Sequence, residues 1–189
     1  MRSINNVEEI FHKSGAILNG HFQLTSGLHS PIYWEKFRVL QSPSLTAKLC
    51  HMISAHFAKQ KIRVVAGPTT GGIILAYEVA RQLGVRGIFA EKEKDKARIF
   101  RRDFGIGPSE EVLIVDDILT TGKSIVEVIN LVTNAGGKVI GIGVLVDRSE
   151  QELNFGVPLF SCLRCVTPTY RLPNCPLCAV GIPLVKPSS

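Results

Sequence analysis

The most informative segment of the chain is Val112-Leu-Ile-Val-Asp-Asp-Ile-Leu-Thr-Thr-Gly-Lys-Ser124. Its apolar half predicts a buried strand that carries two adjacent carboxylates, Asp116 and Asp117, at its carboxyl end. The turn that follows precedes a helix expected over 123–134, and backbone N–H groups at a helix N-terminus, assisted by hydroxyls, bind phosphate. The carboxylates are placed to accept hydrogen bonds from a sugar on that phosphate. The segment therefore predicts a ribose-phosphate site.

Two other interpretations of this segment explain less of it. The Gly-Lys-Ser tripeptide also occurs in nucleotide-triphosphatase loops, but that motif requires a glycine where Asp117 stands. A strand that ends in a capping aspartate and a polar turn explains one acid, but neither the second acid nor the two threonines.

The flanking sequence predicts an α/β fold. Short apolar strands are expected at 62–66, 87–90, 112–116 and 139–146, with helices at 6–14, 43–60, 72–83 and 123–134. Strands that alternate with helices in this way indicate a parallel sheet covered on both faces. Ligands of such sheets bind beyond the carboxyl ends of the strands, where the Gly, Asp and Thr clusters of this chain fall.

Length and composition are those of one globular domain. The 189 residues are divided into an N-terminal part (1–60), a core (61–150) and a tail (151–189), with 45% hydrophobic and 20% charged residues. The net charge of +6 favours polyanionic partners, either nucleic acid or phosphorylated metabolites. No apolar run reaches the length of a membrane span and the start does not resemble a signal peptide, so we expect a cytoplasmic protein without membrane contact.

The tail differs in composition from the rest of the chain. Six of the ten prolines lie within 158–187. Because proline disrupts helix interiors, we expect a short strand followed by irregular chain, with no further helix.

The 112–124 segment resembles the phosphoribosyl-diphosphate motif of type I phosphoribosyltransferases, and the chain is similar to the orotate-specific branch of that family. Three more segments support the resemblance in the expected order: Gly20-His-Phe-Gln-Leu-Thr-Ser-Gly-Leu-His-Ser-Pro-Ile-Tyr33, Val65-Ala-Gly-Pro-Thr-Thr-Gly-Gly-Ile-Ile-Leu-Ala76, and Cys175-Pro-Leu-Cys with Gly181-Ile-Pro-Leu-Val-Lys-Pro187. The resemblance covers roughly residues 10–187. It implies the type I phosphoribosyltransferase fold, with a mainly parallel sheet, a small N-terminal hood and a Pro-rich C-terminal extension.

The resemblance also implies a reaction. Ribose 5-phosphate passes from 5-phospho-α-D-ribose 1-diphosphate (PRPP) to N1 of orotate, giving orotidine 5′-monophosphate and diphosphate. Mg²⁺ is expected to bridge the diphosphate, as suits a hard cation held through substrate phosphates. The expected assembly is a homodimer whose active site is shared between subunits. The substrates are orotate and PRPP, and no nucleic acid is expected.

Matching positions in the family assign PRPP-binding residues to two segments. They are Asp116, Asp117, Ile118, Leu119, Thr120, Thr121, Gly122, Lys123 and Ser124 in the motif, with Thr70 and Gly71 in the diphosphate loop. Many members carry a lysine in place of Gly71 and another near Thr25. Both are absent here, and Lys36 is a candidate substitute.

On the orotate side, the resemblance assigns contacts to Thr120 and Arg148. The planar guanidinium of Arg148 suits the orotate carboxylate, although by itself the residue reads as a solvated arginine at a strand end. Tyr33 and Trp34 fall where the family has aromatics beside the base, and they fit a simple core role equally well.

Residues 91–108 predict a long, charge-rich loop between two strands. The family has a mobile catalytic loop here that reaches the neighbouring subunit, which implies catalytic roles for Lys92, Lys94 and Lys96. A solvated, charge-rich hairpin is the alternative.

The cysteines form two Cys-x-x-Cys pairs, which leave two interpretations open. A zinc site would use Cys162, Cys165, Cys175 and Cys178, but the gap between the pairs is shorter than usual. The alternative is reduced thiols packed in the tail. The five histidines show no ligand spacing, and surface or capping roles are expected for them.

Two other functions compete with orotate transfer. A phosphoribosyltransferase for another base is disfavoured by the 20–37 segment. A non-catalytic nucleotide- or RNA-binding regulator on the same fold would use the positive charge, but the basic residues concentrate in the 91–108 segment and not along a helix.

Overall fold

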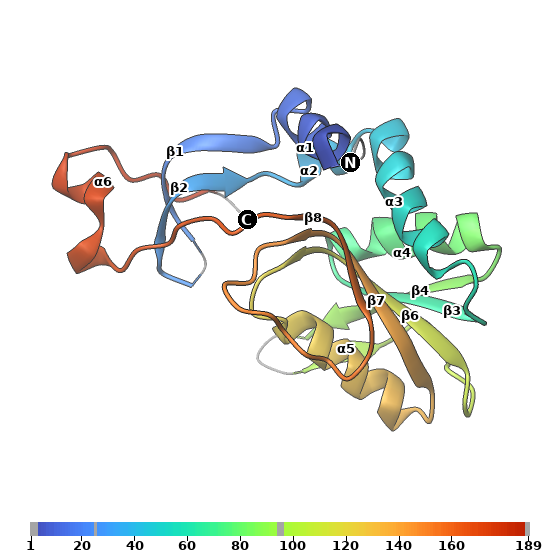
Figure 1. Cartoon of the computed structure of the whole chain (residues 1–189). Helices are drawn as coiled ribbons and strands as arrows, with labels where there is room; N and C mark the ends of the chain where they lie inside the picture. The colour runs from blue at the N-terminus through green and yellow to red at the C-terminus, as the bar shows by residue number, and fades with distance from the viewer. Residues whose placement is uncertain (1–3, 25, 94–96, 188–189) are drawn as a thin grey trace.

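A six-stranded sheet between two helical layers forms the centre of the computed structural model, which describes residues 4–24, 26–93 and 97–187 (Figure 1). The strands are β3 (Val64–Pro68), β4 (Arg86–Lys92), β5 (Arg98–Phe100), β6 (Glu111–Leu119), β7 (Lys138–Asp147) and β8 (Leu159–Arg164). Their order is β5-β4-β3-β6-β7-β8, and β5 alone runs antiparallel to its neighbour. The predicted α/β class with a mainly parallel sheet is confirmed.

Helices cover both faces of this sheet. The helices of one face are α1 (Ile4–Lys13), α2 (Phe37–Leu40), α3 (Pro43–Phe57) and α4 (Gly71–Leu83), and α5 (Lys123–Asn134) covers the other face (Figure 1). Because side chains of a strand alternate between faces, Leu113 and Val115 of β6 pack with the first group and Val112 and Ile114 pack with α5. A strand buried on both faces requires the continuous apolar run that the sequence has.

Strand β7 lies unusually close to α3. An added Cβ at Gly141 would overlap the ring of Phe57, and one at Gly143 would overlap Ile53. The two glycines are therefore required by the close approach of helix to sheet.

A two-stranded antiparallel sheet, β1 (Ile17–Gln23) with β2 (His29–Trp34), stands apart from the central sheet. The tail runs along both of its edges (Figure 1). The Val185 N–H donates to the His21 carbonyl at 2.8 Å, and the His29 N–H donates to the Tyr170 carbonyl at 2.8 Å. The hairpin and the tail thus form one layered unit.

The predicted helices at 43–60, 72–83 and 123–134 correspond to α3, α4 and α5 within three residues at each end. Two expectations were wrong. The tail contains a 3-10 turn, η1 (Leu172–Asn174), and a one-turn helix, α6 (Pro176–Ala179), which proline permits because it occupies the first turn, where no N–H donor is needed. The 91–108 segment is not a continuous loop, because β4 extends to Lys92 and pairs antiparallel with β5, which agrees with the hairpin alternative. Within the described residues, no helix has the length and apolarity that a bilayer crossing requires.

Candidate active site

The carboxyl ends of β3, β6 and β7 bring three predicted segments to one edge of the sheet, where ligands of such folds bind. An added Cβ on Gly71, just after β3, would coincide with the carboxylate of Asp117 at the end of β6. The Arg148 N–H, just after β7, donates to the Leu119 carbonyl at 2.8 Å. The diphosphate loop, the acidic pair and Arg148 therefore lie on neighbouring strands.

Asp116 is a buried carboxylate that the fold holds rigidly. Its Oδ2 accepts a hydrogen bond from Ser124 Oγ at 2.8 Å, and its Oδ1 accepts one from the Asp117 N–H at 2.8 Å. Desolvation, followed by the charge of Asp117, raises the pKa of Asp116 from its ordinary 3.8 to about 7. The folded protein therefore carries an unfavourable buried charge at this position above neutral pH.

Lys36 supplies the cation of this edge. Its Nζ lies 2.9 Å from Oδ2 and 3.0 Å from Oδ1 of Asp117, which also accepts the Ile118 N–H at 2.7 Å. The Lys36 side chain is 34% exposed and that of Asp117 only 5%. Lys36 follows β2, so the hairpin delivers a positive charge to the acidic pair from outside the central sheet.

Asp116→Asn is expected to stabilise the ligand-free protein at high pH. A carboxyl whose pKa is raised on folding stabilises the native state fully below pH 3.8, and that contribution is lost as pH rises towards about 7. The amide keeps the size of the carboxyl and can still accept the Asp117 N–H. The midpoint of the variant relative to the parent should rise between pH 4 and 7, by about 10 °C in total, and then level off.

Thermal unfolding at a series of pH values, followed by circular dichroism, measures this difference. Glu152→Gln, an exposed carboxyl outside the site, is the control and should shift the midpoint equally at every pH. A constant difference for Asp116→Asn would show that the carboxyl is not destabilised by burial.

The turn between β6 and α5 exposes Thr120 and Thr121 and then enters the helix through Gly122. Gly122 has φ +76° and an added Cβ would lie 2.8 Å from the Phe155 ring, so no other residue fits without rearrangement. No side chain caps α5, which leaves the backbone donors of Lys123 and its neighbours directed at the turn. This arrangement suits a phosphate, as the sequence predicts.

Arg148 is a largely buried guanidinium. Its Nε has no hydrogen-bond partner among the described residues, and desolvation lowers the pKa of the group. A desolvated guanidinium without an internal partner can donate two hydrogen bonds to a carboxylate at a small additional desolvation cost. The interpretation of Arg148 as a solvated residue is wrong.

The two aromatic residues of β2 have different environments. Trp34 is 5% exposed and packs edge-on against Phe11 at 5.2 Å between ring centroids, inside the core that contains α1 and α3. Tyr33 is half-buried on the other side of the strand, 5.6 Å from the Phe22 ring. Successive side chains of a strand point to opposite faces, so only one could face a ligand. The core alternative holds for Trp34.

Arg98 is a residue whose importance the sequence did not indicate, because nothing distinguishes it from the other basic residues of its segment. It is 9% exposed, and its guanidinium donates to Thr69 Oγ1 at 3.0 Å. Its Nε forms an ion pair with Glu127 of α5 at 3.2 Å. Arg98 therefore connects the β4–β5 hairpin to the diphosphate loop and to the opposite helical layer.

Most of the other described charges of the hairpin pair with each other. Arg101 lies 2.8 Å from Glu93, and Arg102 lies 2.8 Å from Glu91. The Lys92 N–H donates to Thr69 Oγ1 at 3.3 Å, which sets Lys92 beside the diphosphate loop. Lys94 and Lys96 lie outside the described residues.

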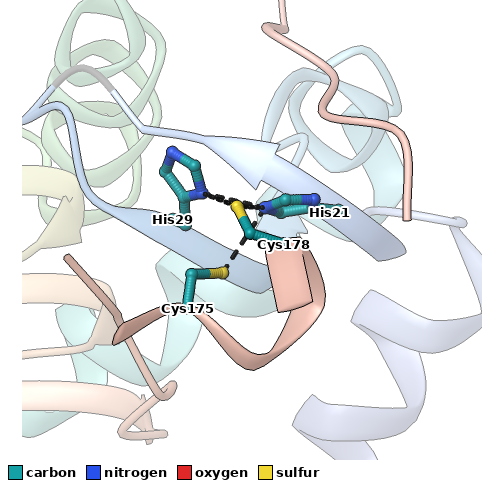
Figure 2. A group of neighbouring side chains, drawn as sticks. All are labelled: His21, His29, Cys175 and Cys178. Carbon is teal, nitrogen blue, oxygen red and sulfur yellow. Dashed lines mark hydrogen bonds between the residues drawn. The ribbon is translucent and has the colours of Figure 1, made fainter. Parts of the chain in front are cut away.

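The four-cysteine zinc site, one of the two interpretations of the Cys-x-x-Cys pairs, does not form. All five cysteines are free, and Cys162 of β8 donates to the Leu49 carbonyl in the core. Cys175 and Cys178 instead lie beside His21 and His29 of the hairpin (Figure 2). The surface or capping role expected for these two histidines is wrong, because each is 2% exposed.

Comparison with known proteins agrees with this geometry. Residues 38–169 match the model of the phosphoribosyl transferase domain, a region that contains the acidic pair, the turn, the diphosphate loop and Arg148. The chain belongs to the phosphoribosyltransferase family. Within this family, the chain is 50% identical to the orotate phosphoribosyltransferase of Desulforamulus reducens over 96% of this chain and 94% of that protein. It is 43% identical to the enzyme of the same name from Chlorobium phaeobacteroides over 96% and 93%.

Solved structures confirm the phosphoribosyltransferase fold. The orotate phosphoribosyltransferase of Aeropyrum pernix is similar with a TM-score of 0.72 and 28% identity, over 84% of this chain and 93% of that one. The adenine phosphoribosyltransferase of Rhodothermus marinus is also similar, with a TM-score of 0.68 and 23% identity over 85% and 99%. The fold is thus shared by enzymes named for different bases and does not by itself select one.

Proposed function

We infer that this phosphoribosyltransferase transfers the phosphoribosyl group of PRPP to N1 of orotate, forming orotidine 5′-monophosphate and diphosphate in pyrimidine biosynthesis. The observation that carries the choice of base is Arg148, whose buried Nε has no hydrogen-bond partner among the described residues and whose backbone is hydrogen-bonded to the ribose-phosphate motif at Leu119. Orotate carries a carboxylate, whereas uracil and the purine bases do not. Relatives about 50% identical over nearly the full chain bear the name of this activity.

The PRPP-binding residues lie in two segments. The backbone of the turn Thr120–Ser124 holds the 5-phosphate, and the carboxylates of Asp116 and Asp117 hold the ribose hydroxyls. Thr70 and Gly71 hold the diphosphate. The absence of a side chain at Gly71 is compatible with this role, because any side chain there would displace the Asp117 carboxylate.

Orotate binds between Arg148 and the hairpin. Arg148 pairs with the carboxylate, Thr120 contacts the ring from the turn, and Tyr33 borders the base from β2. Trp34 has no part in this proposal because its ring is in the core.

The reaction requires positioning and charge, not a protein nucleophile. The bond between C1 and the diphosphate oxygen breaks and the diphosphate leaves with that electron pair. N1 of orotate forms the new bond to C1, and the proton of N1 is released to the diphosphate or to water. Lys92 and Lys36 are the cations available to stabilise the departing diphosphate, Lys92 beside Thr69 and Lys36 beside Asp117.

The residues of the site are compatible with a Mg²⁺ ion that binds to PRPP and not to a cage of protein ligands. Buried carboxylates lie beside the diphosphate loop, but the described residues contain no group of three acidic ligands there that would form a protein cage. Mg²⁺ bound with PRPP supplies positive charge to the diphosphate and keeps most of its ligands from substrate and water.

Three further proposals concern the whole chain. Residues 1–189 act as one domain in which the hairpin and the tail flank the core. Two copies form a homodimer that shares its active sites. The enzyme works in the cytoplasm.

A base panel tests the proposed specificity. Purified protein is incubated with PRPP and Mg²⁺ and with orotate, uracil, adenine or hypoxanthine, and base consumption is followed by absorbance. We expect Mg²⁺-dependent consumption of orotate alone. Turnover of uracil or a purine at a comparable rate would assign the enzyme to another base.

A further inference from the structure

Four side chains from distant parts of the chain meet where the tail packs against the N-terminal hairpin (Figure 2). His21 and His29 come from the two strands of the N-terminal hairpin, and Cys175 and Cys178 bracket the first turn of α6. One nitrogen or sulfur atom of each residue lies within 4.8 Å of all the others. The four atoms are therefore close enough to bind a single ion.

The spacing of these atoms is close to that of a tetrahedral zinc site. Zinc with bonds of about 2.05 Å to nitrogen and about 2.3 Å to sulfur sets nitrogen and sulfur about 3.5 Å apart. Here His21 Nε2 lies 3.5 Å from Cys175 Sγ and 3.6 Å from Cys178 Sγ, and His29 Nδ1 lies 3.4 Å from Cys178 Sγ. The two nitrogens are 2.8 Å apart, so the rings need to separate by about 0.5 Å around the ion.

The outer contact of His21 prepares it as a ligand. Its Nδ1 lies 2.7 Å from the Ile182 carbonyl oxygen, which can only accept a hydrogen bond. The proton of the neutral ring is therefore on Nδ1, and the lone pair of Nε2 points at the cluster. A backbone carbonyl that fixes the tautomer of a histidine in this way is a usual feature of metal sites.

Burial and chemistry favour a metal over an isolated polar cluster. His21, His29 and Cys175 are each at most 3% exposed. Two thiolates and two neutral imidazoles neutralise Zn²⁺, and nitrogen with sulfur is the donor set that zinc prefers to Mg²⁺. The four ligands also close the coordination shell, which is typical of a structural site and not of a catalytic one.

We propose that His21, His29, Cys175 and Cys178 bind a structural zinc ion that fastens the C-terminal tail to the N-terminal hairpin. The site differs from the four-cysteine arrangement in using one Cys-x-x-Cys pair and two histidines more than 140 residues away in the sequence. It holds the hairpin that contains Tyr33 and precedes Lys36, and these two residues border the proposed substrate site. None of the four ligands is assigned a role in the reaction.

Metal analysis of untagged protein tests the proposal. After dialysis against metal-free buffer, elemental analysis by mass spectrometry should find one zinc ion per chain in the parent protein. The zinc content of Cys175→Ser and of Cys178→Ser should be at least about ten-fold lower than that of the parent. Cys162→Ser and Cys165→Ser are the matched controls, because they alter the other Cys-x-x-Cys pair, and they should keep one zinc per chain.

Cobalt substitution tests the site by visible absorption in the parent protein, so it does not depend on whether a variant folds. Parent protein reconstituted with Co²⁺ should show the intense visible bands of tetrahedral cobalt and thiolate-to-cobalt charge transfer, and added zinc should abolish both. Removal of the metal with a strong chelator should lower the thermal midpoint by about 5 °C or more. Parent protein without zinc, a disulfide between Cys175 and Cys178, or equal metal loss in the Cys162→Ser control would overturn the proposal.

Discussion

Arg148→Ala should lower kcat/KM for orotate by about 10²–10³-fold and leave the affinity for PRPP nearly unchanged. Truncating one partner of a buried charge pair costs about 2–5 kcal/mol, because the remaining charge is left unpaired in a desolvated site. The Arg148 Nε has no other acceptor among the described residues, so its loss affects the ligand and not an internal ion pair. Steady-state kinetics with varied orotate, and calorimetry with PRPP, measure the two quantities.

Two further variants show whether the bidentate geometry of the Arg148 guanidinium is responsible for the loss of activity. Arg148→Lys keeps the charge without bidentate geometry and should recover only part of the activity. Arg164→Ala is the matched control, since Arg164 ends the neighbouring strand, is half-exposed and lies 3.9 Å from Asp147. Unchanged kinetics in Arg148→Ala, or an equal loss of PRPP affinity, would contradict the assigned contact with orotate.

The second large effect is expected from Lys92→Ala, which should lower kcat by about 10²-fold. Removing a single group that stabilises developing negative charge typically costs 10²–10³ in kcat, and the diphosphate gains its full charge only as the bond to C1 breaks. The Lys92 N–H donates to Thr69 Oγ1 at 3.3 Å, so the residue lies beside the diphosphate loop. The KM for PRPP should change much less than kcat. Lys138→Ala, at the far end of the sheet, should behave as the parent.

A mixture of two inactive variants distinguishes a site within one chain from a shared one. If Lys92 acts in the partner's site, equal amounts of Arg148→Ala and Lys92→Ala form mixed dimers that each contain one intact site. Random assortment then restores about one quarter of parental activity. No recovery after subunit exchange would place Lys92 in its own chain's site.

The core of the fold was predictable because its signals are local. The apolar run ending in Asp116 and Asp117 marks a doubly buried strand, and Gly122 marks the turn into α5. The edges of the molecule were harder. The β4–β5 pairing was expected only as the hairpin alternative to a loop, because charged residues obscure a short edge strand. Helix α6 was missed because proline disrupts a helix unless it lies in the first turn, as Pro176 does.

The candidate site was predictable only where the residues are close in sequence. The contact of Lys36 with Asp117 spans 81 positions, and its existence depends on how the hairpin packs against the sheet. The two histidines were assigned to the surface for the same reason. His21 and His29 are eight residues apart, and only the pairing of β1 with β2 and the return of the tail bring them to Cys175.

Product analysis with the purified protein alone is the most direct test of the proposed reaction. Orotate and PRPP are supplied in equal amounts with Mg²⁺, and the products are identified by mass spectrometry and phosphorus NMR. The account predicts equal amounts of orotidine 5′-monophosphate and diphosphate, with none formed when Mg²⁺ is withheld. Binding of PRPP without formation of either product, with orotate or any other base, would contradict the enzyme assignment and favour a regulatory nucleotide-binding protein on this fold.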